Sequence, residues 1–526
     1  MKKKEIVIIL FASLMFVVAC KKTETETPVR LFRPVIAGSL VADSNAILAG
    51  WQKIKGSISY TLQVSHDTFL TVDVSVNVVD TGIVLVKNLQ WDRLYQVQVK
   101  ANAADTTLNS KWSNLGAIRT PKFPTILNTP AASDITESAV KVSWTNSGAA
   151  VTSVKVLKAT DSSVVTTLTL TTTDVSNQYK IISGLGSSTG FIIFLYSGAN
   201  VRGWANFNTK APFAGNLIDL RGITGRPSVL ADTIPIIASG STVILKRGET
   251  YEIASAISLS KSITIISGSD LQVNAQAVIS MPSNFNIVSG SAIDSIIFSD
   301  VTLRGTDYAS KYVFNINVAC TIGKMSFLSC RAEIFRGMVR TQAQPAIINN
   351  FLVDNCIADS LAGYGILTVD VATSRVDNIT IRNSTIYKAE KLIVSRNNST
   401  AVTIENCTVN EAALGGGASY YVDYNTSPTN NVTTGITINN SIFGVGKSSA
   451  GIQTVRGIRA NAATNISASN NYRTSDQVSL GNDIPNIVTY TRPVVQLFQD
   501  PANGIYKIID NTFPGRSNSG DPRWRL

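Results

Sequence analysis

Between Asp300 and Asn471 the chain repeats a short pattern in which apolar and polar positions alternate and then meet a bend. The clearest copies run from Ile379 to Ser384, from Val402 to Cys407 and from Ile436 to Ser441. Alternation with a period of two predicts a short strand with one buried face. A lone strand of this length cannot bury that face, so strands from successive coils must stack in parallel around a shared core. The pattern therefore predicts a right-handed parallel β-helix.

Each copy ends in Asn or Ser followed by a small residue, at intervals of 23 to 34 residues that suit a solenoid with variable loops. The small residues are Asp300, Cys330, Cys356, Ser384, Cys407, Ser441 and Asn471. The preceding positions are Ser299, Ser329, Asn355, Asn383, Asn406, Asn440 and Asn470, and Ile297 aligns with Phe327 in the second apolar column. Asn tolerates the left-handed conformation and bonds its own backbone, so this ladder is interpreted as a structural corner.

Four cysteines lie in the repeat region, at Cys320, Cys330, Cys356 and Cys407. Adjacent coils are close enough for a Cys330–Cys356 disulfide, and an exported protein meets an oxidising environment. Stacked free thiols are the favoured interpretation, because the same column also accepts Ser and Asp. No Cys-x-x-Cys or His partner accompanies them, so no metal site is expected.

The N-terminus has three lysines, an apolar run from Ile6 to Val18 and then Ala19 and Cys20. This pattern predicts a signal peptide over residues 1–19 that is too short to span a bilayer permanently. Val17 to Cys20 resembles a bacterial lipobox, which implies lipidation at Cys20. Residues 20–29 are expected to form a disordered tether. The expected location is the outer membrane, lipid-anchored at the cell surface.

The formal charge is +11, and removal of residues 1–19, with three Lys and one Glu, leaves +9. A basic exported protein favours a polyanion such as an acidic polysaccharide. Nucleic acid is not an expected partner, because export removes the chain from the cytoplasm and no recognised motif occurs.

Residues 30–121 alternate as short antiparallel strands, and residues 122–212 repeat the arrangement. Trp51 and the interval from Leu89 to Tyr95 resemble the core tryptophan and tyrosine corner of a fibronectin type III module. In the second module Trp144 takes the place of Trp51, and Phe191 lacks the corner hydroxyl. Both modules are interpreted as spacers.

The β-helix is expected over residues 213–475, beginning with strands in 241–253 and 259–266, with a segment over 476–526 that caps the last coil. These opening strands, the Asn corners and the terminal Gly520 to Trp524 resemble exported lipoproteins of glycan-degrading Bacteroidetes. The resemblance implies fibronectin type III modules before a pectin-lyase-like β-helix of unknown function, and a partner in glycan-uptake machinery.

Catalytic signatures are sparse. The only histidine, His66, lies in the first module, which excludes a solenoid mechanism that needs histidine. A lyase would use Arg336, Lys388 or Lys391 as a base and would need carboxylates that hold Ca²⁺ as its cofactor. The acids are scattered along the solenoid: Asp354, Asp359, Asp370, Asp377 and Glu390.

Basic residues are plentiful on the solenoid: Arg304, Arg331, Arg336, Arg340, Arg382, Lys388, Lys391 and Arg396. A binding function would use Lys388 and Lys391, which follow one corner together with Tyr387, and Arg304. Tyr387 adjoins Lys388, and Arg304 is taken as the equivalent of Lys388 four coils earlier. A long excursion from Asn410 to Gly435 carries further aromatic candidates, Tyr420, Tyr421 and Tyr424. These tyrosines suit either carbohydrate stacking or cover of the solenoid flank.

Three functions follow in order of preference. The first is binding of an acidic, pectin-like polysaccharide by the β-helix. The second is a calcium-dependent polysaccharide lyase, and the third is an adhesion or structural role at the cell surface.

Overall fold

The computed structural model describes residues 29–122, 124–417, 419–424 and 430–526. The chain divides into two compact units: one runs to Pro130 and includes 142–180 and 190–207, and the other contains 131–141, 181–189 and 208–526. Within the described residues no helix is long and apolar enough to cross a membrane. The predicted signal peptide and Cys20 lie outside the described residues.

The first module is an antiparallel β-sandwich. Its sheets contain β1 (Val41–Asp43), β2 (Ala46–Gly50) and β5 (Ile83–Val86), and β4 (Val74–Val78), β3 (Ser59–Ser65), β6 (Leu94–Asn102) and β7 (Ser113–Arg119). Trp51 is 2% exposed and packs in the core with Leu89. The backbone N–H of Gln90 donates to the Tyr95 hydroxyl at 3.0 Å, which confirms the predicted tyrosine corner.

The second module repeats this plan. Its sheets contain β10 (Val164–Thr169), β9 (Ser153–Lys158), β12 (Gly190–Ser197) and β13 (Asn200–Asn208), and β11 (Tyr179–Ser183) with β8 (Ala139–Ser143). Trp144 is 2% exposed, and the rings of Phe191 and Phe207 stack at 5.4 Å. The prediction that Trp51 and Trp144 are core residues is confirmed.

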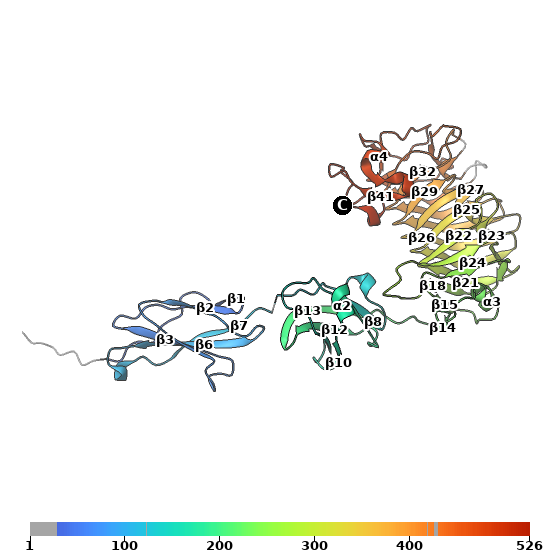
Figure 1. Cartoon of the computed structure of the whole chain (residues 1–526). Helices are drawn as coiled ribbons and strands as arrows, with labels where there is room; N and C mark the ends of the chain where they lie inside the picture. The colour runs from blue at the N-terminus through green and yellow to red at the C-terminus, as the bar shows by residue number, and fades with distance from the viewer. Residues whose placement is uncertain (1–28, 123, 418, 425–429) are drawn as a thin grey trace, which may run out of the picture. The chain divides into compact units, whose positions relative to one another are not determined.

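The remainder forms three stacks of parallel strands, visible as the ladder of arrows in Figure 1. The first contains β14 (Asn216–Asp219), β15 (Ser241–Leu245), β18 (Ile263–Ser267), β21 (Ala292–Ser299), β24 (Cys320–Leu328), β26 (Ala346–Asp354), β28 (Arg375–Arg382), β31 (Ser399–Glu405), β34 (Val432–Asn439) and β37 (Ile466–Ser469). The all-β fold class, two sandwiches followed by a parallel β-helix, is thus confirmed.

Two other stacks complete each coil. The second contains β16 (Thr250–Glu252), β19 (Ala277–Met281), β22 (Val301–Gly305), β25 (Arg331–Thr341), β27 (Ile357–Val369), β29 (Thr385–Ala389), β32 (Thr408–Ala412), β35 (Ile442–Phe443), β38 (Tyr472–Arg473) and β39 (Val488–Thr489). The third contains β17 (Ile257–Leu259), β20 (Phe285–Ile287), β23 (Tyr312–Ile316), the ends of β25 and β27, β30 (Ile393–Ser395), β33 (Tyr420–Asp423) and β36 (Arg456–Arg459).

The predicted corner column is present, and it contains Asp300 in place of Ser299. Its φ angles lie between 51° and 57° at Asp300, Ser329, Asn355, Asn383, Asn406, Asn440 and Asn470. The predicted alignment of the first copy is wrong by one residue: Ser299 pairs with Leu328 and Ile297 with Ser326. The reason is that Phe298, which is fully buried, takes the core place opposite Phe327.

A second left-handed corner was missed by the sequence reasoning. Ile334, Ser360, Lys388 and Glu411 follow one another in register, with φ between 47° and 63°. Their side chains share no property, so the sequence carries no signal for this corner. Left-handed backbone at a β-branched residue such as Ile334 is costly, and it persists here because the strands on both sides are fixed by stacking.

The C-terminal segment was predicted to cap the last coil, and its contacts also reach earlier coils. After α4 (Val494–Leu497), β40 (Phe498–Asp500) and β41 (Ile505–Ile508), residues 509–526 run back along the solenoid flank. Gly520 N–H donates to the Asn440 carbonyl at 2.8 Å, Trp524 Nε1 to Thr385 Oγ1 at 2.7 Å, and Arg523 to the Asn355 carbonyl at 2.7 Å. We call residues 494–526 the strap.

All four solenoid cysteines are free and buried, as favoured from the sequence. Burial raises the pKa of Cys320 to about 11 and that of Cys407 to about 12. These thiols therefore stay protonated near neutral pH and pack as small apolar groups.

We expect Asn383→Ala to destabilise the solenoid by about 1–3 kcal/mol, because Ala resists positive φ and loses the bond from Asn383 to Asp354. Asn383→Gly removes the same bond but accepts the backbone angle, so its loss is smaller. Urea unfolding of the full chain, read by hydrogen exchange in β28 and β31, measures both. Equal stability of all three proteins would contradict the corner role.

Candidate functional site

Each acid singled out in the sequence is held by a basic side chain. Asp354 pairs with Arg382, Asp359 with Arg331, Asp370 with Arg340 and Arg396, Asp377 with Arg375, and Glu390 with Lys447. Among the described residues no group of three or more His, Cys, Asp or Glu side chains is placed to hold a metal ion. The arrangement does not supply the carboxylate cluster that a calcium site needs.

One row of polar side chains crosses the second stack. Arg304 pairs in register with Glu333, Glu333 with Asp359, and Asp359 with Tyr387. Arg331 lies beside this row and binds both acids, and Asp359 also accepts a hydrogen bond from the Tyr387 hydroxyl at 3.1 Å. The row therefore places two acids side by side, with Arg304 and Arg331 as their positive partners.

Burial sets the protonation of this row. Burial opposes ionisation of Glu333, but hydrogen bonds from Arg331 and Arg304 leave its pKa lowered. At Asp359 burial dominates and the pKa is raised, even though Arg331 opposes the shift. Burial also raises the pKa of Tyr387, which stays a neutral phenol. A buried network of charges and hydrogen bonds of this kind holds its side chains in fixed positions.

The strap covers the Tyr387 end of the row. The Tyr387 ring lies 5.6 Å from Tyr506, a Cβ at Gly504 would stand 2.5 Å from its hydroxyl, and Lys388 Nζ donates to the Ala502 carbonyl at 3.0 Å. Arg304 is equivalent to Tyr387, three coils earlier, and not to Lys388 as predicted. Tyr387 and Lys388 are thus engaged by the chain itself.

The expected excursion from Asn410 to Gly435 contains a strand, β33, so its interpretation as one long loop is wrong. Tyr421 and Tyr424 are 2% and 1% exposed and belong to the solenoid core, and the Tyr424 hydroxyl donates to Ser399 at 2.6 Å. Tyr420 is also buried, beneath the Arg459 guanidinium at 4.3 Å. Because their rings are buried, Tyr421 and Tyr424 offer no ring face to a ligand.

A different aromatic residue gathers the basic side chains. The register of β25 with β27 shifts between Phe335, opposite Leu361, and Gly337, opposite Gly365, so β27 holds two extra residues. Tyr364 lies in this bulge. A bulge redirects side chains and is common beside functional sites.

Three cations surround Tyr364. The Arg340 guanidinium lies 4.0 Å from the ring centroid, Arg336 4.9 Å and Lys391 Nζ 5.8 Å, and the Tyr312 ring is 5.6 Å away. Arg340 also forms an ion pair with Asp370. Burial lowers the pKa of Arg340, but the ion pair outweighs this effect and leaves the pKa of Arg340 raised. We call Tyr364, Arg336, Arg340 and Lys391 the Tyr364 site.

Glycine makes the bulge possible. A Cβ at Gly337 would stand 2.6 Å from the Tyr364 Cβ, and Gly365, at φ +56°, lies directly against the Lys391 carbonyl. Any larger residue at either position would displace Tyr364 or Lys391.

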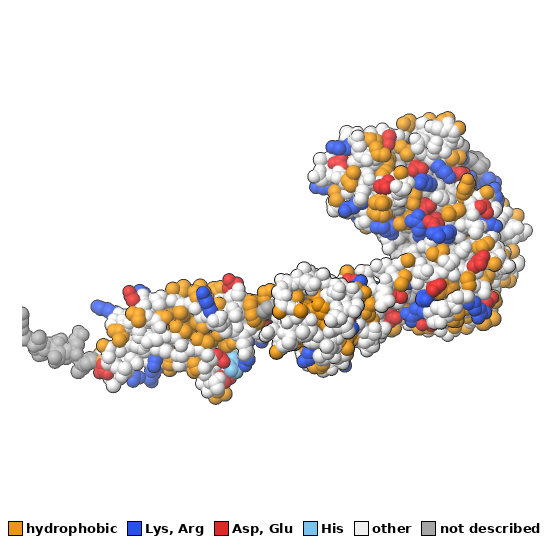
Figure 2. All heavy atoms as spheres, in the orientation of Figure 1, with side chains coloured by type: hydrophobic (Ala, Val, Ile, Leu, Met, Phe, Trp, Pro, Cys, Tyr) orange, Lys and Arg blue, Asp and Glu red, His pale blue; other side chains and the backbone are white. Residues whose placement is uncertain are grey.

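Arg336 and Lys391 form no ion pair with any carboxylate in the described residues, in contrast to Arg340. Figure 2 shows the more common arrangement on the solenoid, where most blue Lys and Arg side chains lie next to red Asp and Glu. The Tyr364 site therefore carries excess positive charge beside a half-buried aromatic ring.

Of this site, the sequence had pointed to Arg336 as a candidate catalytic residue, to Lys391 as a candidate for both catalysis and ligand binding, and to Arg340 only as one of many basic residues. Tyr364 was missed. The available signal was Gly363-Tyr364-Gly365, an aromatic residue between two glycines in a coil longer than its neighbour.

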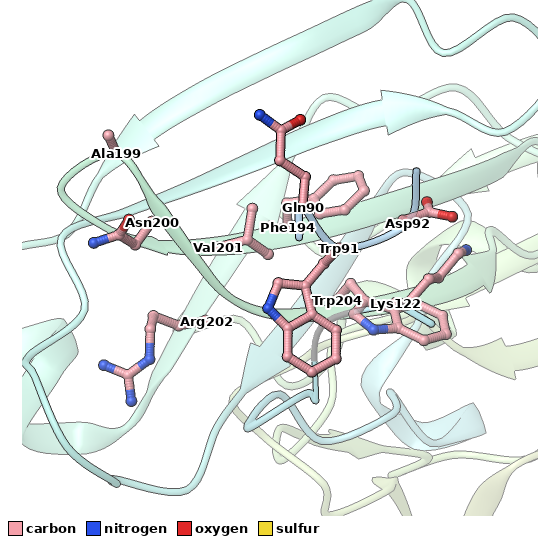
Figure 3. A pocket seen from close by; sticks show the side chains of 10 residues that line it. All are labelled: Gln90, Trp91, Asp92, Lys122, Phe194, Ala199, Asn200, Val201, Arg202 and Trp204. Carbon is pink, nitrogen blue, oxygen red and sulfur yellow. The ribbon is translucent and has the colours of Figure 1, made fainter. Parts of the chain in front are cut away.

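The first unit has a hollow of about 850 Å³, drawn in Figure 3. Trp91, Trp204 and Arg202 line it, and Lys122 Nζ lies 4.4 Å from the centroid of the Trp204 ring. Trp204 and Trp112 are half-buried beneath lysines, whereas Trp51 and Trp144 fill the module cores.

Comparisons with known proteins match two regions of the second unit and leave the chemistry open. A model described as a domain of unknown function (DUF4957) matches residues 249–389, and another domain of unknown function (DUF5123) matches residues 402–524. No curated protein matches the chain.

Solved structures that match include fibronectin type III segments. The FN1–FN3 domains of chicken CNTN1 are 15% identical over 35% of this chain and 69% of that chain, with a TM-score of 0.17. A two-domain segment of chicken tenascin is 16% identical over 34% of this chain and 99% of that chain, with a TM-score of 0.20.

We expect Tyr387→Phe to destabilise the solenoid by about 1–3 kcal/mol, because the hydroxyl that links Arg331 and Asp359 is lost in a buried place. The matched control is Tyr308→Phe, since Tyr308 is 63% exposed. Urea unfolding compares the two variants with the unchanged protein. Unchanged stability in Tyr387→Phe would show that the hydroxyl has no structural role.

Proposed function

We propose that the β-helix binds an acidic polysaccharide, with a pectin-like uronate chain favoured, at the Tyr364 site. The observation that carries this proposal is the presence of Arg336 and Lys391 without carboxylate partners beside the Tyr364 ring. Elsewhere on the solenoid, most arginines are neutralised within the protein.

The chemistry of the site matches such a ligand in two ways. Arg336 and Lys391 offer N–H donors to the carboxylates of uronate sugars, and charge-assisted bonds of this type are the strong ones. The Tyr364 ring is half-buried, and an aromatic ring supplies an apolar face against which a sugar ring can pack. Gly337 and Gly365 hold the ring in place, so the site needs little reorganisation on binding.

A calcium-dependent lyase is the second candidate in the order set by the sequence, and no specific contact favours it. Its base would be Arg336 or Lys391. The acid that pairs with Arg340 of the site, Asp370, also pairs with Arg396, and Glu390, next to Lys391 in the sequence, pairs with Lys447. Adhesion without a glycan ligand remains the third candidate.

The proposal places this binding surface outside the cell. Lipidation at Cys20 would anchor the chain in the outer membrane, with residues 20–29 as a tether and the two sandwiches as spacers. The signal-like residues 1–19 and the cysteine that follows them support this location. Glycan-uptake machinery is the partner that such a location would serve.

We expect the double variant Arg336→Gln/Lys391→Gln to bind polygalacturonate about 30-fold more weakly than the unchanged protein, because it loses two contact charges worth ~1 kcal/mol each in water. Affinity electrophoresis or calorimetry at low ionic strength measures the change. Added salt should weaken binding by the unchanged protein, because the charges lie near the surface.

The matched control is Lys324→Gln/Lys507→Gln, which removes the same charge from β24 and β41. Retained binding in this control and loss in the first variant support the Tyr364 site; equal loss in both reduces the effect to net charge. Incubation with polygalacturonate and Ca²⁺ tests the lyase. Formation of unsaturated uronate by the unchanged protein, and its loss in the first variant, would show that the site cleaves the polysaccharide and does not merely bind it.

A further inference from the structure

Basic side chains without a carboxylate partner gather on one stack of the solenoid. Within the described residues of 213–526, the lysines and arginines that pair with neither an acid nor a backbone carbonyl are Lys311, Lys324, Arg336, Lys391, Arg456 and Lys507. Lys324 and Lys507 belong to other sheets. The other four lie on or beside the third stack.

The strand order places these four cations along one line of the solenoid, at β23, β25, β30 and β36, and the coils of β27 and β33 between them carry none of the four. Lys311 precedes β23, and its carbonyl accepts the Arg336 N–H at 2.7 Å. Gly337 pairs with Gly365, and Gly365 lies against the Lys391 carbonyl.

The next strands carry the row onward. β30 pairs with β33, and in the following coil Tyr420 pairs with Arg456. The row therefore runs from β23 across β25, β27, β30 and β33 to β36.

A second tyrosine with cations stands at the far end of this row. Arg456 lies 5.7 Å from the centroid of the Tyr420 ring, and its Nη1 donates to the Tyr420 hydroxyl at 3.4 Å. Arg459 lies 4.3 Å from the same ring but is neutralised by two hydrogen bonds to Asp423. Tyr420 and Arg456, two and three strands beyond Tyr364, thus repeat the combination of an aromatic ring and a cation without a carboxylate.

We propose that the third stack is one elongated site, on which a linear polyuronate lies along the solenoid axis from Lys311 and Arg336 to Arg456. This inference rests on the proposed function and extends it, because it requires the bound polysaccharide to have a minimum length. Six strands separated by about 4.8 Å span roughly 24 Å. A chain must be that long to meet all four charges, so a short oligomer engages only the Tyr364 site.

The test compares trigalacturonate with long polygalacturonate in calorimetry at low ionic strength. Arg456→Gln should weaken binding of the long chain about fivefold, the effect of one contact charge pair in water, and leave trigalacturonate binding unchanged. Arg336→Gln/Lys391→Gln should weaken both ligands. Arg456→Lys keeps the charge and should restore long-chain binding, which separates loss of charge from local disturbance around Tyr420.

The outcomes distinguish the two proposals. If the unchanged protein binds neither ligand, the proposed function fails. If Arg336→Gln/Lys391→Gln weakens binding but Arg456→Gln binds the long chain like the unchanged protein, the site is local and the elongated site is overturned. An equal loss of both ligands in Arg456→Gln also overturns it, because length then plays no part. Lys324→Gln is the charge-matched control and should leave both affinities unchanged.

Discussion

The stacking of parallel strands in register is the constraint on which the other features depend. Each coil presents its apolar positions to the same interior, and Phe298, Phe327 and Phe351 follow one another there at ring separations of 5.7 and 6.1 Å. Because each strand is hydrogen-bonded to the coil before and after it, a single residue inserted in one coil must leave the ladder as a bulge. The same constraint makes side chains from distant parts of the sequence neighbours on the outer surface.

Stacking also determines which charged side chains form ion pairs. Arginine and acid side chains in equivalent positions come within ion-pair distance across coils, as Arg382 does with Asp354 and Arg340 with Asp370. Such pairs neutralise most of the solenoid surface. The Tyr364 site differs: it lies where the register of β25 with β27 shifts, and Arg336 and Lys391 form no ion pair there with a described carboxylate.

The sequence was sufficient for the architecture and only partly for the site. Alternating apolar residues with Asn383, Asn406 and Asn440 at the bends predicted the stacked coils, because Asn has a conformational preference that the pattern makes visible. The residues at the second corner, such as Ile334 and Ser360, share no conformational preference, so the sequence did not predict that corner. Register was the other limit: the first copy was misaligned at Asp300, since only the burial of Phe298 decides which residue faces the core.

The strap has a consequence for the order in which the molecule is completed. Arg523 bonds the carbonyl of Asn355, 168 residues earlier, and Trp524 bonds Thr385, 139 residues earlier. The coils can assemble one upon another as they leave the ribosome, but these long-range contacts form only when the last residues have been synthesised. Loss of the final few residues would therefore leave a stacked solenoid without these contacts, and the flank at Asn355 and Thr385 would meet water, while residues 502–506 would still cover Tyr387.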